Sequence, residues 1–139
     1  MIRTSILIAL TTLAISSCNN TNTMTKPIPT TTDPKQNGTS GYALVNGLNM
    51  YHEIYAPGMT LVLIHGGGST LQTTFGRVIH DFAQTHQVIA VEMQAHGHTA
   101  DIDRPLSFQQ DADDIAGLLK HLNIDKADIF GFSNGASTT

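Results

Sequence analysis

Two uninterrupted apolar segments of strand length constrain the fold more than any other feature of this sequence. Residues 59–65 read MTLVLIH and residues 87–93 read QVIAVEM. Runs of this length without polar alternation are typical of strands that are buried on both faces of a sheet. Strands that alternate with helices predict a mostly parallel sheet with helices on its faces. Between the two runs, four apolar residues at helical spacing predict one apolar helix face: Phe75, Val78, Ile79 and Phe82.

The flanking segments continue this alternation. Residues 42–55 form two strand-like runs around Asn46-Gly47, the dipeptide most typical of a two-residue hairpin turn. A second helix is predicted to begin after Ser107, which can form an S-x-x-Q capping box with Gln110, and residues 126–130 predict a last strand. The expected order is therefore hairpin, strand, helix, strand, helix, strand, which is an α/β fold with right-handed crossovers.

The first residues have the layout of an export signal. Arg3 precedes an apolar run over residues 6–15, which is shorter than the roughly 20 residues of a membrane-spanning helix. Small residues then lead into Cys18, the only cysteine of the chain, so that residues 1–17 resemble a bacterial lipoprotein signal peptide. This resemblance implies that Cys18 is lipidated and that the protein is anchored in the bacterial cell envelope, where Asn19 favours the outer membrane. A plain signal peptide is the alternative.

Composition separates a tether from a domain. Residues 18–40 are rich in Thr and Asn and have too little apolar surface to offset the entropy of ordering, which predicts a flexible tether. Residues 41–139 are expected to form the one domain for which 139 residues leave room. The formal net charge of −4 and the lack of a basic stripe argue against nucleic-acid binding.

Two glycine-rich motifs follow predicted strands, which is where ligands bind in open α/β sheets. Residues 65–68 read HGGG, and their backbone N–H groups suit the oxyanion of an acyl-transfer intermediate. A plain chain reversal is one alternative, and a phosphate loop is another that would need a Lys after the glycines. Residues 131–135 read GFSNG, a G-x-S-x-G motif that places Ser133 as a nucleophile on a strand-to-helix turn.

Together these motifs resemble the amino-terminal half of the α/β-hydrolase family. The resemblance covers about residues 41–139, and residues 92–99 also match the family's D-x-R-G-x-G-x-S loop, though loosely. It implies a serine-nucleophile hydrolase that acts on an ester-, amide- or similar acyl-type small molecule, without a cofactor or a metal. The residues that it assigns are the nucleophile Ser133, the oxyanion donors Gly67 and Asn134, and the neighbours Gly66 and Gly68, which can share the donor role.

The groups that activate a catalytic serine are not found after Ser133 in this sequence. In the family an acid and then a histidine follow the nucleophile, whereas residues 134–139 read NGASTT. The resemblance therefore implies an incomplete triad, a sheet with one open edge and a chain that is inactive in this form. His96 and His98 are alternative bases, or two ligands of an H-x-H zinc site. A non-catalytic lipid-anchored binding protein and an unstable remnant are the competing hypotheses.

Overall fold

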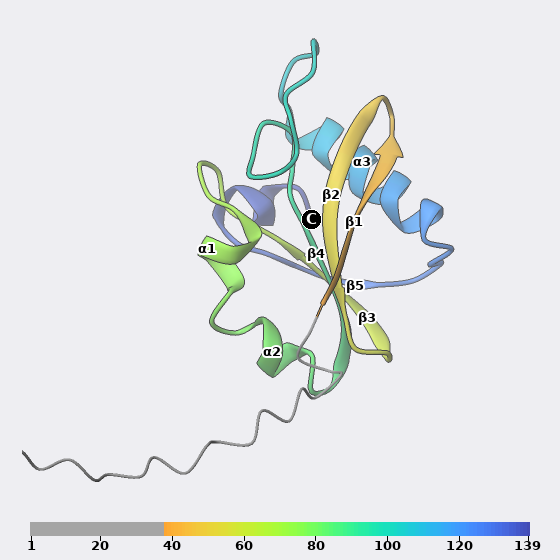
Figure 1. The fold of residues 1–139 in the computed structure, drawn as a ribbon. Coiled ribbons are helices and arrows are strands. Elements are labelled where there is room, and N and C mark those ends of the chain that lie inside the picture. The colour runs from red at the N-terminus through yellow and green to blue at the C-terminus, as the bar shows by residue number, and fades with distance from the viewer. Residues whose placement is uncertain (1–37) are drawn as a thin grey trace, which may run out of the picture. The chain divides into compact units, whose positions relative to one another are not determined.

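The computed structural model describes residues 38–139, and the predicted signal peptide, Cys18 and most of the predicted tether lie outside the described residues. Lipidation at Cys18 thus stays a prediction of the sequence. Within the described part, one sheet combines with short helices and one longer helix (Figure 1). The strands are Thr39–Val45 (β1), Leu48–Tyr55 (β2), Met59–Ile64 (β3), His86–Val91 (β4) and Asp128–Gly131 (β5). The helices are Leu71–Phe75 (α1), Ile79–Phe82 (α2), Phe108–His121 (α3) and the 3₁₀ helix Ser133–Ser137 (η1).

The strand order confirms the α/β topology expected from the sequence. It runs β1-β2-β4-β3-β5 across the sheet. β3 pairs in parallel with β4 and β5, whereas β2 pairs antiparallel with β1 and β4, so the sheet is mixed. Because the carboxyl ends of adjacent parallel strands meet at the same edge of a sheet, the loops that follow β3 and β5 emerge next to each other.

β1 and β2 form the predicted hairpin. Asn46 and Gly47 have φ angles of 48° and 83°, and a two-residue turn that matches the twist of its strands requires positive values at both positions. β1 begins at Thr39, earlier than the expected domain boundary at Gly41, because this end of the strand pairs with the end of β2. The predicted tether is therefore wrong for its last two residues.

Helices cover both faces of the sheet, and each face has its own apolar core. On one face α3 contributes Ile115 and Leu118 to a cluster with side chains of β1 to β4. On the other face α1 and α2 contribute Phe75 and Ile79 to a second cluster (Figure 1). Residues 61–64 of β3 belong to both clusters in alternation, which explains why this strand is apolar throughout.

The single helix expected between β3 and β4 is interrupted. α1 ends at Phe75 and α2 begins at Ile79, and Val78 between them has a non-helical backbone (φ −121°, ψ −10°). Gly76 marks the stop, because a glycine inside a helix costs about 1 kcal/mol relative to Ala through its greater loss of backbone entropy. Phe75 and Ile79 are buried as predicted, whereas Val78 is 40% exposed.

α3 is the helix predicted after Ser107. The Ser107 hydroxyl accepts a hydrogen bond from the Gln110 N–H at 3.1 Å, as in a capping box. The Gln110 side chain donates to Asp114 instead, so the box forms only in part. α3 has 14 residues, and no helix in residues 38–139 is both long enough and apolar enough to cross a membrane.

Candidate active site at the carboxyl ends of the strands

Ser133 lies on a tight turn directly after β5. The strand ends at Gly131 and η1 begins at Ser133 itself. Ser133 has a φ of 52° and an exposed side chain. A non-glycine residue in this left-handed region costs about 1–3 kcal/mol, and such strain gathers at functional sites. A strained, exposed serine between a strand and a helix has the geometry of a nucleophile elbow.

The two glycines of the motif leave no room for side chains. A Cβ at Gly131 would lie 2.3 Å from the carbonyl oxygen of Gly135. A Cβ at Gly135 would lie 2.3 Å from the carbonyl oxygen of Ile64, the last residue of β3. The Phe132 N–H also donates to this Ile64 oxygen at 3.0 Å. The elbow is therefore packed against the point where β3 ends and the other glycine-rich motif begins.

The glycine loop, residues 65–68, lies against the elbow. A Cβ at Gly66 would lie 3.2 Å from Cδ1 of Phe132 and 3.4 Å from Cβ of Ser133, and a Cβ at Gly67 would lie 3.5 Å from the Asn134 side chain. Gly66 thus lets the glycine loop lie closer to the elbow than a larger residue would allow. The structure brings together the two glycine-rich motifs that the sequence places after predicted strands.

The backbone N–H groups of the loop are not equivalent. The Gly68 N–H donates to Nε2 of His96 at 3.1 Å and is occupied. Within the described residues, no acceptor takes the N–H of Gly67 or of Asn134. These two groups are the donors that an incoming oxyanion would find free, and among the neighbours Gly66 is better placed than Gly68 to share the role.

Two histidines connect the glycine loop to the segment after β4. His65 is fully buried; its Nε2 accepts from the Met93 N–H at 3.1 Å, so Nδ1 carries the proton that is donated to the Gly66 oxygen at 2.7 Å. His96 repeats this pattern, because Nε2 accepts from Gly68 while Nδ1 contacts the Gln94 oxygen at 2.8 Å. Both rings have each nitrogen engaged in a hydrogen bond. They position the loop, and neither has a nitrogen free to take a proton from Ser133.

Folding stability is expected to fall as the pH drops below about 6.5. Burial lowers the pKa of His65, chiefly by desolvation of the charged ring, and burial also lowers the pKa of His52. Below about pH 6.5 these histidines bind protons in the unfolded chain but not in the folded chain. The free energy of unfolding therefore falls as the pH is lowered, until the lower pKa values of the folded state are reached. We expect urea unfolding to give a lower free energy at pH 5.5 than at pH 7.5, and His65→Gln to reduce that difference. An unchanged difference in His65→Gln would contradict the role assigned to His65.

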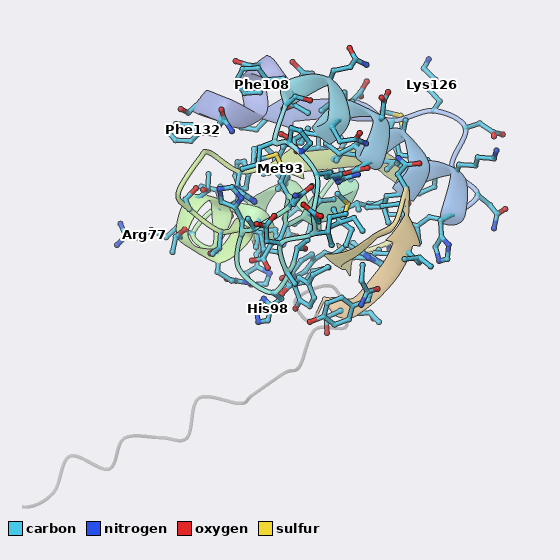
Figure 2. The ribbon with its side chains drawn as sticks, turned by 90° about the horizontal axis from the view of Figure 1, so that it is seen from above. Arg77, Met93, His98, Phe108, Lys126 and Phe132 are labelled. Atoms are coloured by element: carbon cyan, nitrogen blue, oxygen red, sulfur yellow. The ribbon has the colours of Figure 1, made fainter. Side chains whose placement is uncertain are left out.

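The loop after β4, residues 92–99, is held by a buried glutamate. Glu92 is 1% exposed, and its carboxylate accepts from the His98 N–H and pairs with His98 Nδ1 at 2.9 Å. The His98 ring stacks on Tyr51 with centroids 4.3 Å apart, and Figure 2 shows His98 at the lower edge of the molecule, away from Phe132 at the upper left. His98 is therefore not brought to Ser133. Residues 38–139 contain no group of three or more His, Cys, Asp or Glu side chains that could hold a metal ion.

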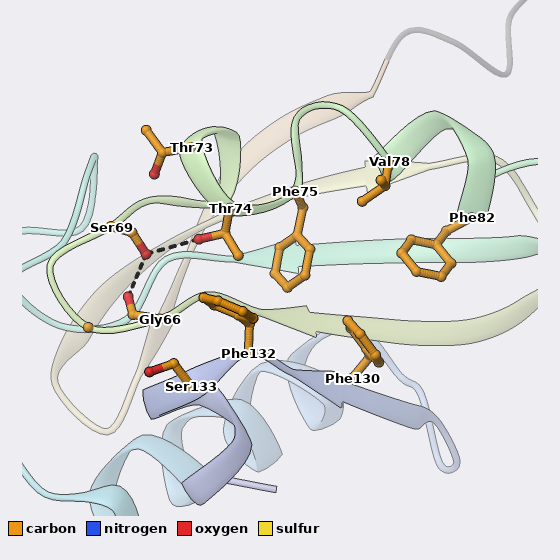
Figure 3. Close-up of a pocket in the computed structure, with 11 residues that line it drawn as sticks. Gly66, Ser69, Thr73, Thr74, Phe75, Val78, Phe82, Phe130, Phe132 and Ser133 are labelled. Carbon is orange, nitrogen blue, oxygen red and sulfur yellow. Dashed lines mark hydrogen bonds between the residues drawn. The ribbon is translucent and has the colours of Figure 1, made fainter.

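An apolar pocket of about 560 Å³ opens beside Ser133. Figure 3 shows Ser133 and Gly66 at one end of this pocket and Phe82 and Phe130 at the other. The rings of Phe82 and Phe130 lie 5.7 Å apart, and the Ser69 hydroxyl supports the loop by donating to the Gly66 oxygen at 2.7 Å. Sequence reasoning missed this pocket because its residues come from the glycine loop, from α1 and α2, and from the end of β5. The one signal was the pair of aromatic residues at positions 130 and 132, around the strand end.

Known proteins are similar to this chain in sequence and in fold. No protein-family model matches the sequence. A curated protein of Haemophilus influenzae, described as a "Putative esterase/lipase", is 26% identical over 78 residues, which cover 56% of this chain and 26% of that protein. The crystal structure of the enol-lactonase from Burkholderia xenovorans LB400 matches with a TM-score of 0.66 and 25% identity, over 70% of this chain and 39% of that chain. The epoxide hydrolase CorEH without ligand matches with a TM-score of 0.70 and 27% identity, over 73% of this chain and 36% of that chain.

These three proteins are α/β-hydrolases, and their descriptions name hydrolytic activities. The described residues form part of an α/β-hydrolase fold. The chain spans about a quarter of the curated relative that it matches, and 39% and 36% of the two solved structures.

Proposed function

We propose that this protein is a serine-nucleophile hydrolase and that its substrate is an acyl-type small molecule, most simply an ester. The observation that carries the proposal is the contact between the strained Ser133 turn and a glycine loop with a free N–H at Gly67. Acyl transfer needs a nucleophile and oxyanion donors at one point, and few other reactions need both. The esterase/lipase and lactonase descriptions of two relatives agree with a cleaved acyl–oxygen bond.

In the proposed mechanism the Ser133 hydroxyl oxygen attacks the acyl carbon while its proton passes to a general base. The N–H groups of Gly67 and Asn134 stabilise the negative charge that develops on the acyl oxygen. The alcohol leaves with a proton, and water then hydrolyses the acyl-enzyme. We assign the base and its acidic partner to none of the described residues, because His65 and His96 are engaged in the loop and His98 is paired with Glu92 and stacked on Tyr51.

The direct test is covalent labelling with a fluorophosphonate probe on the full-length native protein. We expect the label on Ser133, located by mass spectrometry of the tryptic peptide. Such probes react with activated serines in preference to ordinary ones, because they mimic the acyl carbon and occupy the oxyanion position. Labelling at another serine, or at none, would argue against the proposed mechanism.

The apolar pocket is expected to hold the acyl chain. Val78 lines it and is 40% exposed, so Val78→Phe is expected to fill the pocket without disturbing the core. Each apolar CH₂ group that loses its buried contact costs about 0.8 kcal/mol, so the loss of two such contacts reduces kcat/KM about tenfold. We expect Val78→Phe to lower kcat/KM for p-nitrophenyl octanoate by that factor while p-nitrophenyl acetate is little affected.

The matched control is Leu44→Phe, which adds the same side chain at an exposed position on the β1–β2 hairpin. It is expected to leave both esters unaffected. An equal loss for octanoate and acetate in Val78→Phe would mean that the pocket does not bind the acyl chain.

A further inference from the structure

A second pocket lies on the other side of the elbow. It has a volume of about 340 Å³, and the residues that line it are Leu106, Ser107, Phe108, Asp111 and Asn134. It shares no lining residue with the apolar pocket, but Ser133 lines the apolar pocket and its chain neighbour Asn134 lines this one. Figure 2 shows Phe108 and Phe132 at the same end of the molecule. The two pockets therefore border adjacent residues of the elbow.

Asp111 is the unusual member of this lining. Its side chain is only 9% exposed, yet within the described residues no group donates a hydrogen bond to its carboxylate. Asp114, one turn further along α3, has the opposite situation, because its carboxylate accepts from Asn46, Gln110 and Arg104. Buried carboxylates are normally paired, since an isolated ionised group in an apolar environment is costly. The Asp111 carboxylate thus faces the pocket without a partner from the protein.

The charges around Asp111 do not neutralise it. Burial and then the neighbouring Asp114 carboxylate raise the pKa of Asp111, while His96 and Arg104 lower it. Arg104 is committed to Asp114, to which it donates with two guanidinium nitrogens. No basic residue lines the pocket. Asp111 lies in the first turn of α3, whose N-terminus carries a partial positive charge, and a cation from outside would supply the full countercharge that no lining side chain offers.

We propose that this pocket binds the ammonium group of an organic cation. The Asp111 carboxylate offers the countercharge, and the half-exposed Phe108 ring offers an aromatic face, which attracts cations through its quadrupole. Leu106 adds apolar surface that suits methyl or methylene groups next to the charge. An anion would be repelled by Asp111, and a neutral alkyl group would give the carboxylate neither a countercharge nor a hydrogen-bond donor. The pocket therefore favours an alkylammonium group over a neutral group of the same shape.

This subsite deepens the proposed function. If Ser133 attacks an acyl carbon whose chain lies in the apolar pocket, the group beyond Asn134 is the opposite end of the substrate. The substrate class would then be an acyl compound with an ammonium-bearing leaving group. That part of the inference rests on the proposed function, whereas the charge preference of the pocket does not.

The test uses choline and 3,3-dimethylbutan-1-ol, which have the same shape and differ in charge. Each is titrated into the full-length ¹⁵N-labelled protein, and amide shifts are followed by NMR. We expect choline to shift the amides of residues 106–111 and of Asn134, with an affinity about tenfold higher than that of the alcohol. Equal affinities, or shifts elsewhere only, would overturn the proposal.

Three variants make the result specific. Asp111→Asn is expected to abolish the preference for choline, and Phe108→Leu, at an exposed position, is expected to reduce it severalfold. Asp113→Asn removes an exposed carboxylate of α3 that does not line the pocket, and it is expected to bind as the wild type does. Ser133→Ala is expected to retain choline binding, so a failure of the proposed catalysis would be distinguishable from a failure of this subsite. An undiminished preference in both Asp111→Asn and Phe108→Leu would refute the proposal.

Discussion

Ser133→Ala is expected to reduce ester hydrolysis by at least about a thousandfold, because alanine has no oxygen with which to attack the acyl carbon. The substitution removes one exposed atom and leaves the backbone that places the N–H groups of Gly67 and Asn134. Folding stability should therefore change little. A small residual rate above that of water is expected, since the oxyanion donors and the pockets still bind the substrate.

The measurement is the initial rate of p-nitrophenyl ester hydrolysis by the full-length protein, together with fluorophosphonate labelling. Ser137→Ala is the matched control, because Ser137 is an exposed serine of the same 3₁₀ helix that lines neither pocket. It should keep both the rate and the label. A Ser133→Ala variant that hydrolyses esters at the wild-type rate would rule out Ser133 as the nucleophile.

Gly135→Ala is expected to destabilise the fold by about 3 kcal/mol or more and to abolish labelling of Ser133. The added Cβ would lie 2.3 Å from the Ile64 oxygen and 2.6 Å from the His65 oxygen, and backbone oxygens cannot rotate away as a side chain can. Either the elbow moves away from β3 or the end of β3 moves, and overpacking of this kind costs 1–3 kcal/mol or more. Both movements would separate Ser133 from the glycine loop.

Urea unfolding of Gly135→Ala and of the wild type measures this effect. Gly41→Ala is the control, because a Cβ there would meet the His52 ring at 3.6 Å, an ordinary contact distance. Its free energy of unfolding should lie close to that of the wild type. If Gly135→Ala were as stable as the wild type and were labelled equally, the close packing of the elbow on β3 would be incorrect.

Local patterns predicted most of the fold. Asn46-Gly47 specified the hairpin turn, the apolar runs specified β3 and β4, and Ser107 specified the start of α3, because each of these signals acts within a few residues of the chain. The helix after the glycine loop was predicted as one piece, since its apolar spacing is continuous. In the structure the helix is interrupted after Gly76. The sequence alone did not indicate that the effect of this glycine would be stronger than that of the helical spacing of the apolar residues.

The candidate site was predicted less completely. The motifs named Ser133, Asn134 and the glycines, and the strand order explains why they meet. The sequence did not reveal that the Gly68 N–H donates to His96 or that the Met93 N–H donates to His65, because these hydrogen bonds join residues 28 positions apart. Nothing in the sequence indicated that Asp111 is buried while Asp113 is exposed, because Asp111, Asp113 and Asp114 are the same residue type within one helix.

The sequence by itself determined the order of the elements, the positions of the two glycine-rich motifs and the identity of the candidate nucleophile. Backbone conformation within a motif depends on local residue types, so Gly and Ser at fixed spacing were sufficient to predict it. Only the tertiary structure decided which N–H groups stay free, which histidines are engaged and which carboxylate faces a pocket. Hydrogen-bond partners and burial arise when distant segments pack together, and no local pattern records that packing.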